Sequence, residues 1–318
     1  MPDRELHKML DEAIEAILAG AEVEASNAEL DALVRTAREL RDMPSREFHQ
    51  RLSSELNRRA VMTVSTTKSI REGFRTVTPY LTVPEGDRLI EFLQRTFGAE
   101  ELHRSPSAAG FHAEVRIGDS MLMIGSGDSH RGHERIGAFH VYVPDCDAAY
   151  SRAVEAGAES MGEPTDRPYG ERSGFVKDFA GNHWYIAARF PNITAPEGLG
   201  TVLPFLLPKD ARALIDFLKR AFGAEEMAVF EEAGRVMHAA VRIGDAVLEM
   251  GEPPNEAPLL PSLFFLYVPD CDAWHRRAVA AGAVSLAEPE DKPWGARAAL
   301  ARDPFGYEWG TAALLTSK

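Results

Sequence analysis

The chain has 318 residues, of which 45% are hydrophobic and 26% charged, a composition typical of a globular protein with two or three domains. Its formal net charge of −14 gives it no electrostatic reason to bind phosphate backbones, so we expect no nucleic-acid partner. The sequence has no apolar run of about 18 residues and no signal-peptide core, and its two cysteines lie in separate domains. We therefore expect a cytoplasmic protein with reduced thiols and no membrane partner.

Residues 1–65 differ in kind from the rest and predict a helical arm. Hydrophobic residues recur at helical spacing from Leu6 to Leu18, and Ser26-Asn27-Ala28-Glu29 has the form of a capping box that opens a second helix. A third helix follows Pro44. Three short amphipathic helices must bury their apolar faces, either on the later domains, on a second subunit or on a partner protein.

The next segment alternates strands with single helices. We expect a strand over 76–83, which Pro79 limits to a sheet edge or a strand start, and a helix over 87–97. Strands over 100–104, 111–117 and 121–124 follow, with Gly118-Asp119 as a hairpin turn. A strand from His140, a helix over 147–160 and three more strands repeat this βαβββ order.

The second half of the chain copies the first. HVYVPDCD at His140 returns as FLYVPDCD at Phe265, and Cys146 corresponds to Cys271 at an offset of 125 residues. A period of that length indicates a duplicated domain. We place the first domain at 66–192 and the second at 193–318, the latter including a helix over 272–285.

Several short motifs occur once in each copy: the helix ending FGAEE, the hairpin HAEVRIGD or HAAVRIGD, RPYG or KPWG, and D-x-x-G-x-x-W. With them the chain resembles the glyoxalase/bleomycin-resistance/extradiol-dioxygenase superfamily, the vicinal oxygen chelate proteins, and its demethylubiquinone methyltransferase-like branch. The resemblance implies an α+β fold with two tandem domains. Each domain would consist of paired βαβββ modules whose mixed sheet forms a cup around a ligand.

Metal-binding members of this superfamily place one ligand on the first strand and one on the last strand of each module. We assign these positions to Tyr80, Met123, His140 and Tyr185 in the first repeat, and to Phe205, Glu249, Phe265 and Gly310 in the second. Only His140 and Glu249 are good ligands for a divalent ion. They lie in different repeats, and one ligand per cup does not hold a catalytic metal, so we expect no metal and no cofactor. A shared site would need an exchange of modules between the repeats.

Four residues are candidate acid–base groups: His140, His112, Tyr80 and Tyr185. His112 and its counterpart His238 lie in the middle of alternating strands, where each is either a cup-facing base or a histidine bonded to a neighbouring strand. The resemblance places His140 in the cup. With two phenols beside it, His140 would hold or deprotonate a substrate, or the trio would simply fill a cup that has lost its metal.

Glu249 stands among apolar neighbours, so its carboxylate must be paired, protonated or bound to a ligand. A carboxylate among aromatic rings suits a cationic or hydroxylated organic ligand, and the alternative is an ion pair with Arg242 or another arginine. The remaining candidate ligand-binding residues are Met123, Glu114, Tyr169, Phe205, His238, Phe265 and Trp294.

These observations favour a protein that binds a small organic molecule in metal-free cups, as sequestering resistance proteins do. One alternative is a metal-independent isomerase or lyase, with His140 or His112 as base and Tyr80 or Tyr185 as acid. Another is a regulatory scaffold whose helical arm binds a partner. Fusion of the repeats is compatible with a monomer or a homodimer.

Overall fold

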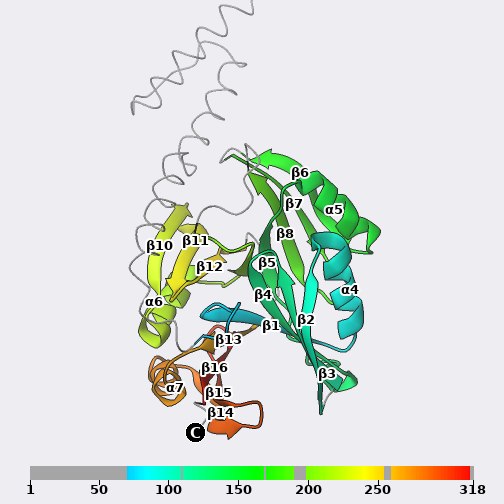
Figure 1. Cartoon of the computed structure of the whole chain (residues 1–318). Helices are drawn as coiled ribbons and strands as arrows, with labels where there is room; N and C mark the ends of the chain where they lie inside the picture. The colour runs from blue at the N-terminus through cyan, green and yellow to red at the C-terminus, as the bar shows by residue number, and fades with distance from the viewer. Residues whose placement is uncertain (1–69, 109, 168–169, 190–197, 254–258, 316–318) are drawn as a thin grey trace, which may run out of the picture. The chain divides into compact units, whose positions relative to one another are not determined.

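The computed structural model describes residues 70–108, 110–167, 170–189, 198–253 and 259–315 (Figure 1). The predicted N-terminal arm lies outside these residues. Within them, no helix combines the length and the apolar character needed to cross a membrane.

The first repeat forms two βαβββ modules, as predicted. Module 1 contains β1 (Val77–Val83), α4 (Gly86–Phe97), β2 (Glu100–Ser107), β3 (Gly110–Ile117) and β4 (Ser120–Ser126). A single 3₁₀ turn, η1 (Asp128–His130), leads to module 2, which contains β5 (Ala138–Tyr142), α5 (Cys146–Glu155), β6 (Glu159–Arg167), β7 (Glu171–Lys177) and β8 (His183–Arg189).

The second repeat has the same order. Module 3 contains β9 (Val202–Leu206), α6 (Ala211–Phe222), β10 (Glu225–Glu232), β11 (Arg235–Ile243) and β12 (Ala246–Met250). Module 4 contains β13 (Leu263–Tyr267), α7 (Cys271–Ala280), β14 (Val284–Lys292), β15 (Ala296–Arg302) and β16 (Glu308–Leu314). The helices predicted over 147–160 and 272–285 were too long, because the chain turns at Gly157 and Gly282, whose φ angles are 94° and 115°.

The modules pair across the repeats. Sheet 1 has the strand order β14-β15-β16-β13-β1-β4-β3-β2 and joins modules 1 and 4, whereas sheet 2 has the order β10-β11-β12-β9-β5-β8-β7-β6 and joins modules 2 and 3 (Figure 1). The α+β fold with paired βαβββ modules is confirmed. The assumption that each repeat closes its own cup is wrong, because β1 pairs with β13 and β5 pairs with β9.

Pro79 lies in a central strand, which corrects the expectation of an edge or a strand start. Residues Val77 to Pro79 pair with β13, and pairing with β4 begins only at Tyr80. The proline therefore stands where β1 has a neighbour on one side, so its missing N–H interrupts no ladder on the other side.

The helix-side cores, in contrast to the sheets, follow the repeats. Helices α4 and α5 pack with strands of modules 1 and 2, around residues such as Leu93, Phe139 and Trp184. Helices α6 and α7 pack with strands of modules 3 and 4, around residues such as Phe217 and Trp309. Each repeat thus buries its own helices while donating one module to each sheet.

Two matching contacts link the repeats where β1 and β9 begin. The Thr76 hydroxyl and backbone N–H both donate to Asp245 Oδ1 at 2.7 Å, and the Thr201 N–H donates to Asp119 Oδ1 at 2.7 Å. Asp119 and Asp245 follow the hairpin glycines Gly118 and Gly244. A Cβ at either glycine would lie 2.2 Å from the threonine hydroxyl oxygen, so these turns must lack a side chain.

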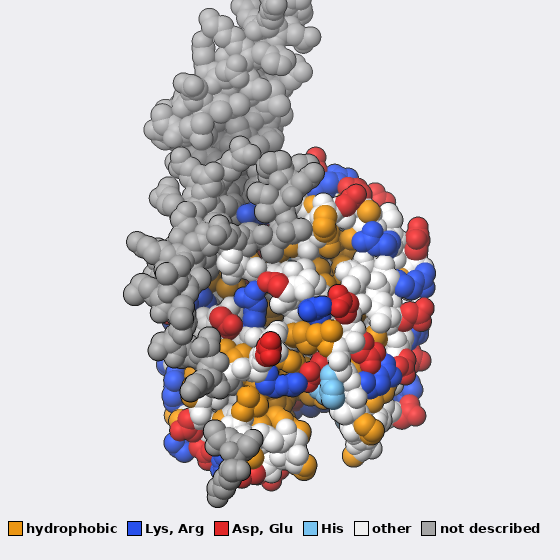
Figure 2. All heavy atoms as spheres, in the orientation of Figure 1, with side chains coloured by type: hydrophobic (Ala, Val, Ile, Leu, Met, Phe, Trp, Pro, Cys, Tyr) orange, Lys and Arg blue, Asp and Glu red, His pale blue; other side chains and the backbone are white. Residues whose placement is uncertain are grey.

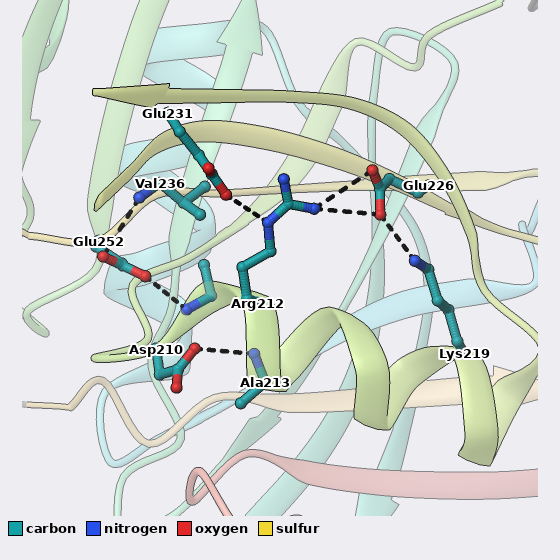
Figure 3. A network of polar contacts seen from close by, with 9 residues as sticks. Asp210, Arg212, Ala213, Lys219, Glu226, Glu231, Val236 and Glu252 are labelled. Carbon is teal, nitrogen blue, oxygen red and sulfur yellow. Dashed lines mark hydrogen bonds and ion pairs between the residues drawn. The ribbon is translucent and has the colours of Figure 1, made fainter. Parts of the chain in front are cut away.

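Side-chain contacts also fix the helices on the sheets. Asp210 caps α6 by accepting from the Ala213 N–H, and Arg212 reaches from the first turn of the helix to Glu231 and Glu226 on β10 (Figure 3). Asp145 and Asp270 cap α5 and α7 in the same way as Asp210. On the face shown in Figure 2, acidic and basic side chains are interspersed and neither sign forms a continuous field.

Candidate functional site

Each sheet has an inner face opposite its helices. Side chains alternate along a strand, so Leu81 enters the helix-side core while Tyr80 points to the inner face. The strand registers place four matched positions on each inner face. On sheet 1 Tyr80 pairs with Met123 and Phe265 with Gly310, and on sheet 2 Phe205 pairs with Glu249 and His140 with Tyr185.

The exchange of modules brings together the two best metal-ligand candidates, which the sequence had placed in separate cups. His140 Nδ1 lies 2.9 Å from Glu249 Oε2 on the inner face of sheet 2. The Glu249 side chain is 6% exposed and that of His140 is 14% exposed. Glu249 is therefore ion-paired, but its partner is His140, whereas Arg242 binds Glu225 at 2.5 Å.

A second carboxylate, Glu171, completes the cluster and was not among the sequence candidates. Its Oε2 lies 3.9 Å from His140 Nε2, and its Oε1 accepts from Arg189 Nε at 3.1 Å and from the Tyr142 hydroxyl at 3.3 Å. The sequence did contain a signal for this residue. Glu171 and its partner Arg189 correspond to Ala296 and Leu314 in the second repeat, so the two copies differ in charge at these positions.

Charges in this cluster shift one another's protonation. Burial alone would raise the pKa of Glu249, but the His140 imidazole, with His238 next to it, holds that pKa well below its usual range. Burial alone would lower the pKa of His140, and the Glu249 carboxylate followed by Glu171 raises it above the ordinary value of 6.5. The two carboxylates therefore favour the protonated form of His140 over that of an isolated imidazole.

Aromatic rings line the inner face of sheet 2 beside the cluster. Phe175 stacks on Tyr185 with centroids 4.4 Å apart, Tyr185 lies 5.0 Å from Phe205, and Phe205 lies 6.2 Å from the His238 ring. All four side chains are neither fully buried nor fully exposed. We call these four residues the ring row of sheet 2.

Sheet 1 carries a different set of residues at the matching places. His112 Nδ1 lies 3.2 Å from the Tyr80 hydroxyl, and the Phe265 ring occupies the space that a side chain at Gly310 would need. Met123 is 3% exposed and packs in the same cluster as Tyr80 and Phe265. Tyr80 therefore lies with His112 and not with His140.

Glu114, next to His112 on β3, is bound by the segment before β1. Arg71 donates to both Glu114 oxygens, at 2.5 and 3.0 Å, and Phe74 packs edge-on against Tyr267 at 5.4 Å. Burial would raise the pKa of Glu114, but hydrogen bonds from His112 and Arg71 lower it to about 2. Residues 70–74 thus cover part of the inner face of sheet 1.

Two sequence candidates remain, Trp294 and Tyr169. Trp294 is 53% exposed and touches the inner face of sheet 1 through the Phe265 ring, with centroids 6.3 Å apart. Tyr169 lies outside the described residues.

The donor set of sheet 2 does not fit the metal centre of the superfamily. Of the four matched positions only His140 and Glu249 carry good ligands, and they bind each other. Phe205 has no donor atom, and burial raises the pKa of the Tyr185 phenol. Among the described residues no group of three or more His, Cys, Asp or Glu side chains is placed to hold a metal ion.

Comparison with known families agrees with this architecture. The model of the Glyoxalase/Bleomycin resistance protein/Dioxygenase superfamily matches residues 74–186 and again residues 199–311. The chain therefore belongs to this superfamily and contains two tandem copies of its domain.

Relatives extend the comparison. Uncharacterized protein Mb0911c of Mycobacterium bovis is 34% identical over 118 residues, which are 33% of this chain and 78% of that protein. Glyoxalase I from Zea mays superposes with a TM-score of 0.59 at 16% identity, covering 75% of this chain and 92% of that one. A putative dioxygenase from Bacillus subtilis gives 0.52 at 16% identity, covering 75% and 86%. At such identities the solved structures establish the shared fold alone.

Proposed function

We propose that this protein binds a small organic molecule on the inner face of sheet 2. The observation that carries the proposal is the buried His140–Glu249 pair beside the partly exposed ring row. In sheet 1 the same backbone positions hold Phe265 and Met123, so the fold does not need charged side chains at these two positions. Burying charge is costly, and buried polar groups beside accessible rings are typical of a ligand site.

The test has two steps: detection of a bound ligand, and then identification of the sheet that binds it. Native mass spectrometry of the full chain, compared with the denatured chain, should detect a co-purified small molecule. We expect Phe205→Ala to lose that molecule and Trp294→Ala, on sheet 1, to retain it. Retention by Phe205→Ala together with loss by Trp294→Ala would contradict a site on sheet 2.

A second candidate function, metal-independent isomerase or lyase chemistry, is favoured by the contact between His112 and Tyr80 at 3.2 Å. An imidazole next to a phenol can pass a proton to and from a bound substrate. His140 is less available as a base, because its Nδ1 is bound to Glu249 and its raised pKa favours the protonated imidazolium, which has no free lone pair. If sheet 1 is catalytic, His112→Gln and Tyr80→Phe should each abolish turnover of a bound carbonyl compound while binding persists.

The other expectations remain proposals. Cys146 and Cys271 are both buried free thiols, which supports a cytoplasmic location. The monomer or homodimer state and a partner-binding role of the N-terminal arm stay predictions.

A further inference from the structure

The ion pairs on the inner face of sheet 2 balance one another. Glu249 is paired with His140 at 2.9 Å, and Glu171 is paired with Arg189 at 3.1 Å. Both carboxylates are almost fully buried. A ligand that brought a charge into this cluster would bury that charge without a counter-ion, which is strongly unfavourable.

One acceptor in the cluster is not fully used. Glu249 Oε2 is bonded to His140, but Oε1 lies 3.6 Å from His238 Nε2, which is longer than a good hydrogen bond. Among the described residues no hydrogen bond reaches the Tyr185 hydroxyl, which belongs to the same face. A ligand hydroxyl therefore finds a carboxylate acceptor at Glu249 and a second polar group at Tyr185.

The ring row determines which ligand shape fits this face. Phe175 and Tyr185 stack with an interplanar angle of 10°, and Phe205 continues the row at 5.0 Å from Tyr185. Phe175 covers one face of Tyr185, and the ring surface that stays partly exposed favours a flat, apolar ligand that packs against it. A flexible aliphatic chain would gain less from the same surface.

We propose that the inner face of sheet 2 selects a neutral, planar aromatic molecule that bears a hydroxyl group. Its ring packs against Phe205 and the part of Tyr185 that Phe175 does not cover, and its hydroxyl donates to Glu249 Oε1. This ligand class rests on the proposed function of sheet 2. It narrows the cationic or hydroxylated ligand expected from the sequence, because His140 already neutralises Glu249.

Sheet 1 offers no equivalent acceptor and serves as the internal control. Arg71 uses both oxygens of Glu114, Met123 stands in place of Glu249, and Phe265 covers Gly310. A ligand of the proposed class would therefore lose its charge-assisted hydrogen bond on sheet 1.

The experiment measures binding of four probes of one size to the full chain at pH 7: 2-naphthol, naphthalene, 2-naphthoate and 2-naphthylmethylammonium. We expect 2-naphthol to bind about tenfold more tightly than each of the others, since a hydrogen bond to a charged acceptor is stronger than one between neutral groups. Glu249→Gln should remove most of this preference and Phe205→Ala should weaken all binding, whereas Trp294→Ala should change neither.

Two other outcomes overturn the inference in distinguishable ways. If a charged probe binds as tightly as 2-naphthol and Phe205→Ala abolishes that binding, the ligand class is wrong but the site on sheet 2 stands. If no probe binds at millimolar concentration and no molecule co-purifies, both the ligand class and the proposed function fail.

Discussion

The inner faces of sheet 1 and sheet 2 occupy equivalent places in one duplicated scaffold, yet two of their matched positions hold opposite chemistry. Where sheet 2 has His140 and Glu249 in an ion pair, sheet 1 has Phe265 and Met123 in an apolar cluster. The same backbone accommodates both sets, so the fold requires only that the volume be filled. The fold therefore does not require the charged set of sheet 2, which supports the ligand site proposed there.

The largest expected effect comes from breaking the pair in sheet 2. His140→Leu leaves Glu249 buried without its main counter-ion and should lower the free energy of unfolding by about 3–5 kcal/mol, measured by urea denaturation. We choose leucine and not phenylalanine, the matching residue of sheet 1. In sheet 1 the Phe265 ring fills the space beside Gly310, whereas in sheet 2 Tyr185 stands at that position.

The matched control for this variant is His140→Leu combined with Glu249→Met, which copies the apolar character of sheet 1. The double variant should recover most of the lost stability, because an apolar replacement of a buried ion pair is often neutral. If the double variant instead loses as much stability as His140→Leu and Glu249→Met lose together, the two residues do not interact.

The reverse change in sheet 1 should be smaller. Met123→Glu places a carboxylate in an apolar cluster and should destabilise the protein by about 2–3 kcal/mol, and adding Phe265→His should restore part of that loss. Thermal unfolding of both variants measures this. If Phe265→His gives no rescue, the two inner faces are not interchangeable.

The stability contributed by the Glu114–Arg71 ion pair should depend on pH. Its pKa is lowered to about 2, so its ion pair with Arg71 adds stability above the ordinary pKa of 4.5 and loses it as pH falls toward 2. Arg71 is partly exposed, so we expect Glu114→Gln to cost about 1–2 kcal/mol at pH 7. Urea unfolding of both proteins from pH 7 to pH 2 should show that difference shrinking, and a constant difference would contradict the pairing.

The smallest effect is expected at Trp294 on sheet 1. Because its ring is 53% exposed, Trp294→Ala should change stability by no more than about 0.5 kcal/mol in thermal unfolding. A loss of several kcal/mol would show that the ring is part of a packed surface.

The sequence predicted the four βαβββ modules and the inner-face positions because short motifs recur at a fixed offset. It did not predict which modules pair. Modules 1 and 3 carry the same strand pattern, so β5 finds an equally suitable edge in β1 or β9. The signal lay in side chains: His140 and Glu249 are complementary, but each stands in a different copy. Glu171 and Arg189 escaped notice because no motif contains them.

The central claim is that both repeats contribute to one charged cluster on sheet 2. Its most direct test is an NMR titration of the His140 imidazole in the full chain and in Glu249→Gln. We predict that the pKa of His140 lies above 6.5 and falls when Glu249 loses its charge. An unchanged pKa in the variant would contradict the pairing of His140 with Glu249 and the exchange of modules that creates it.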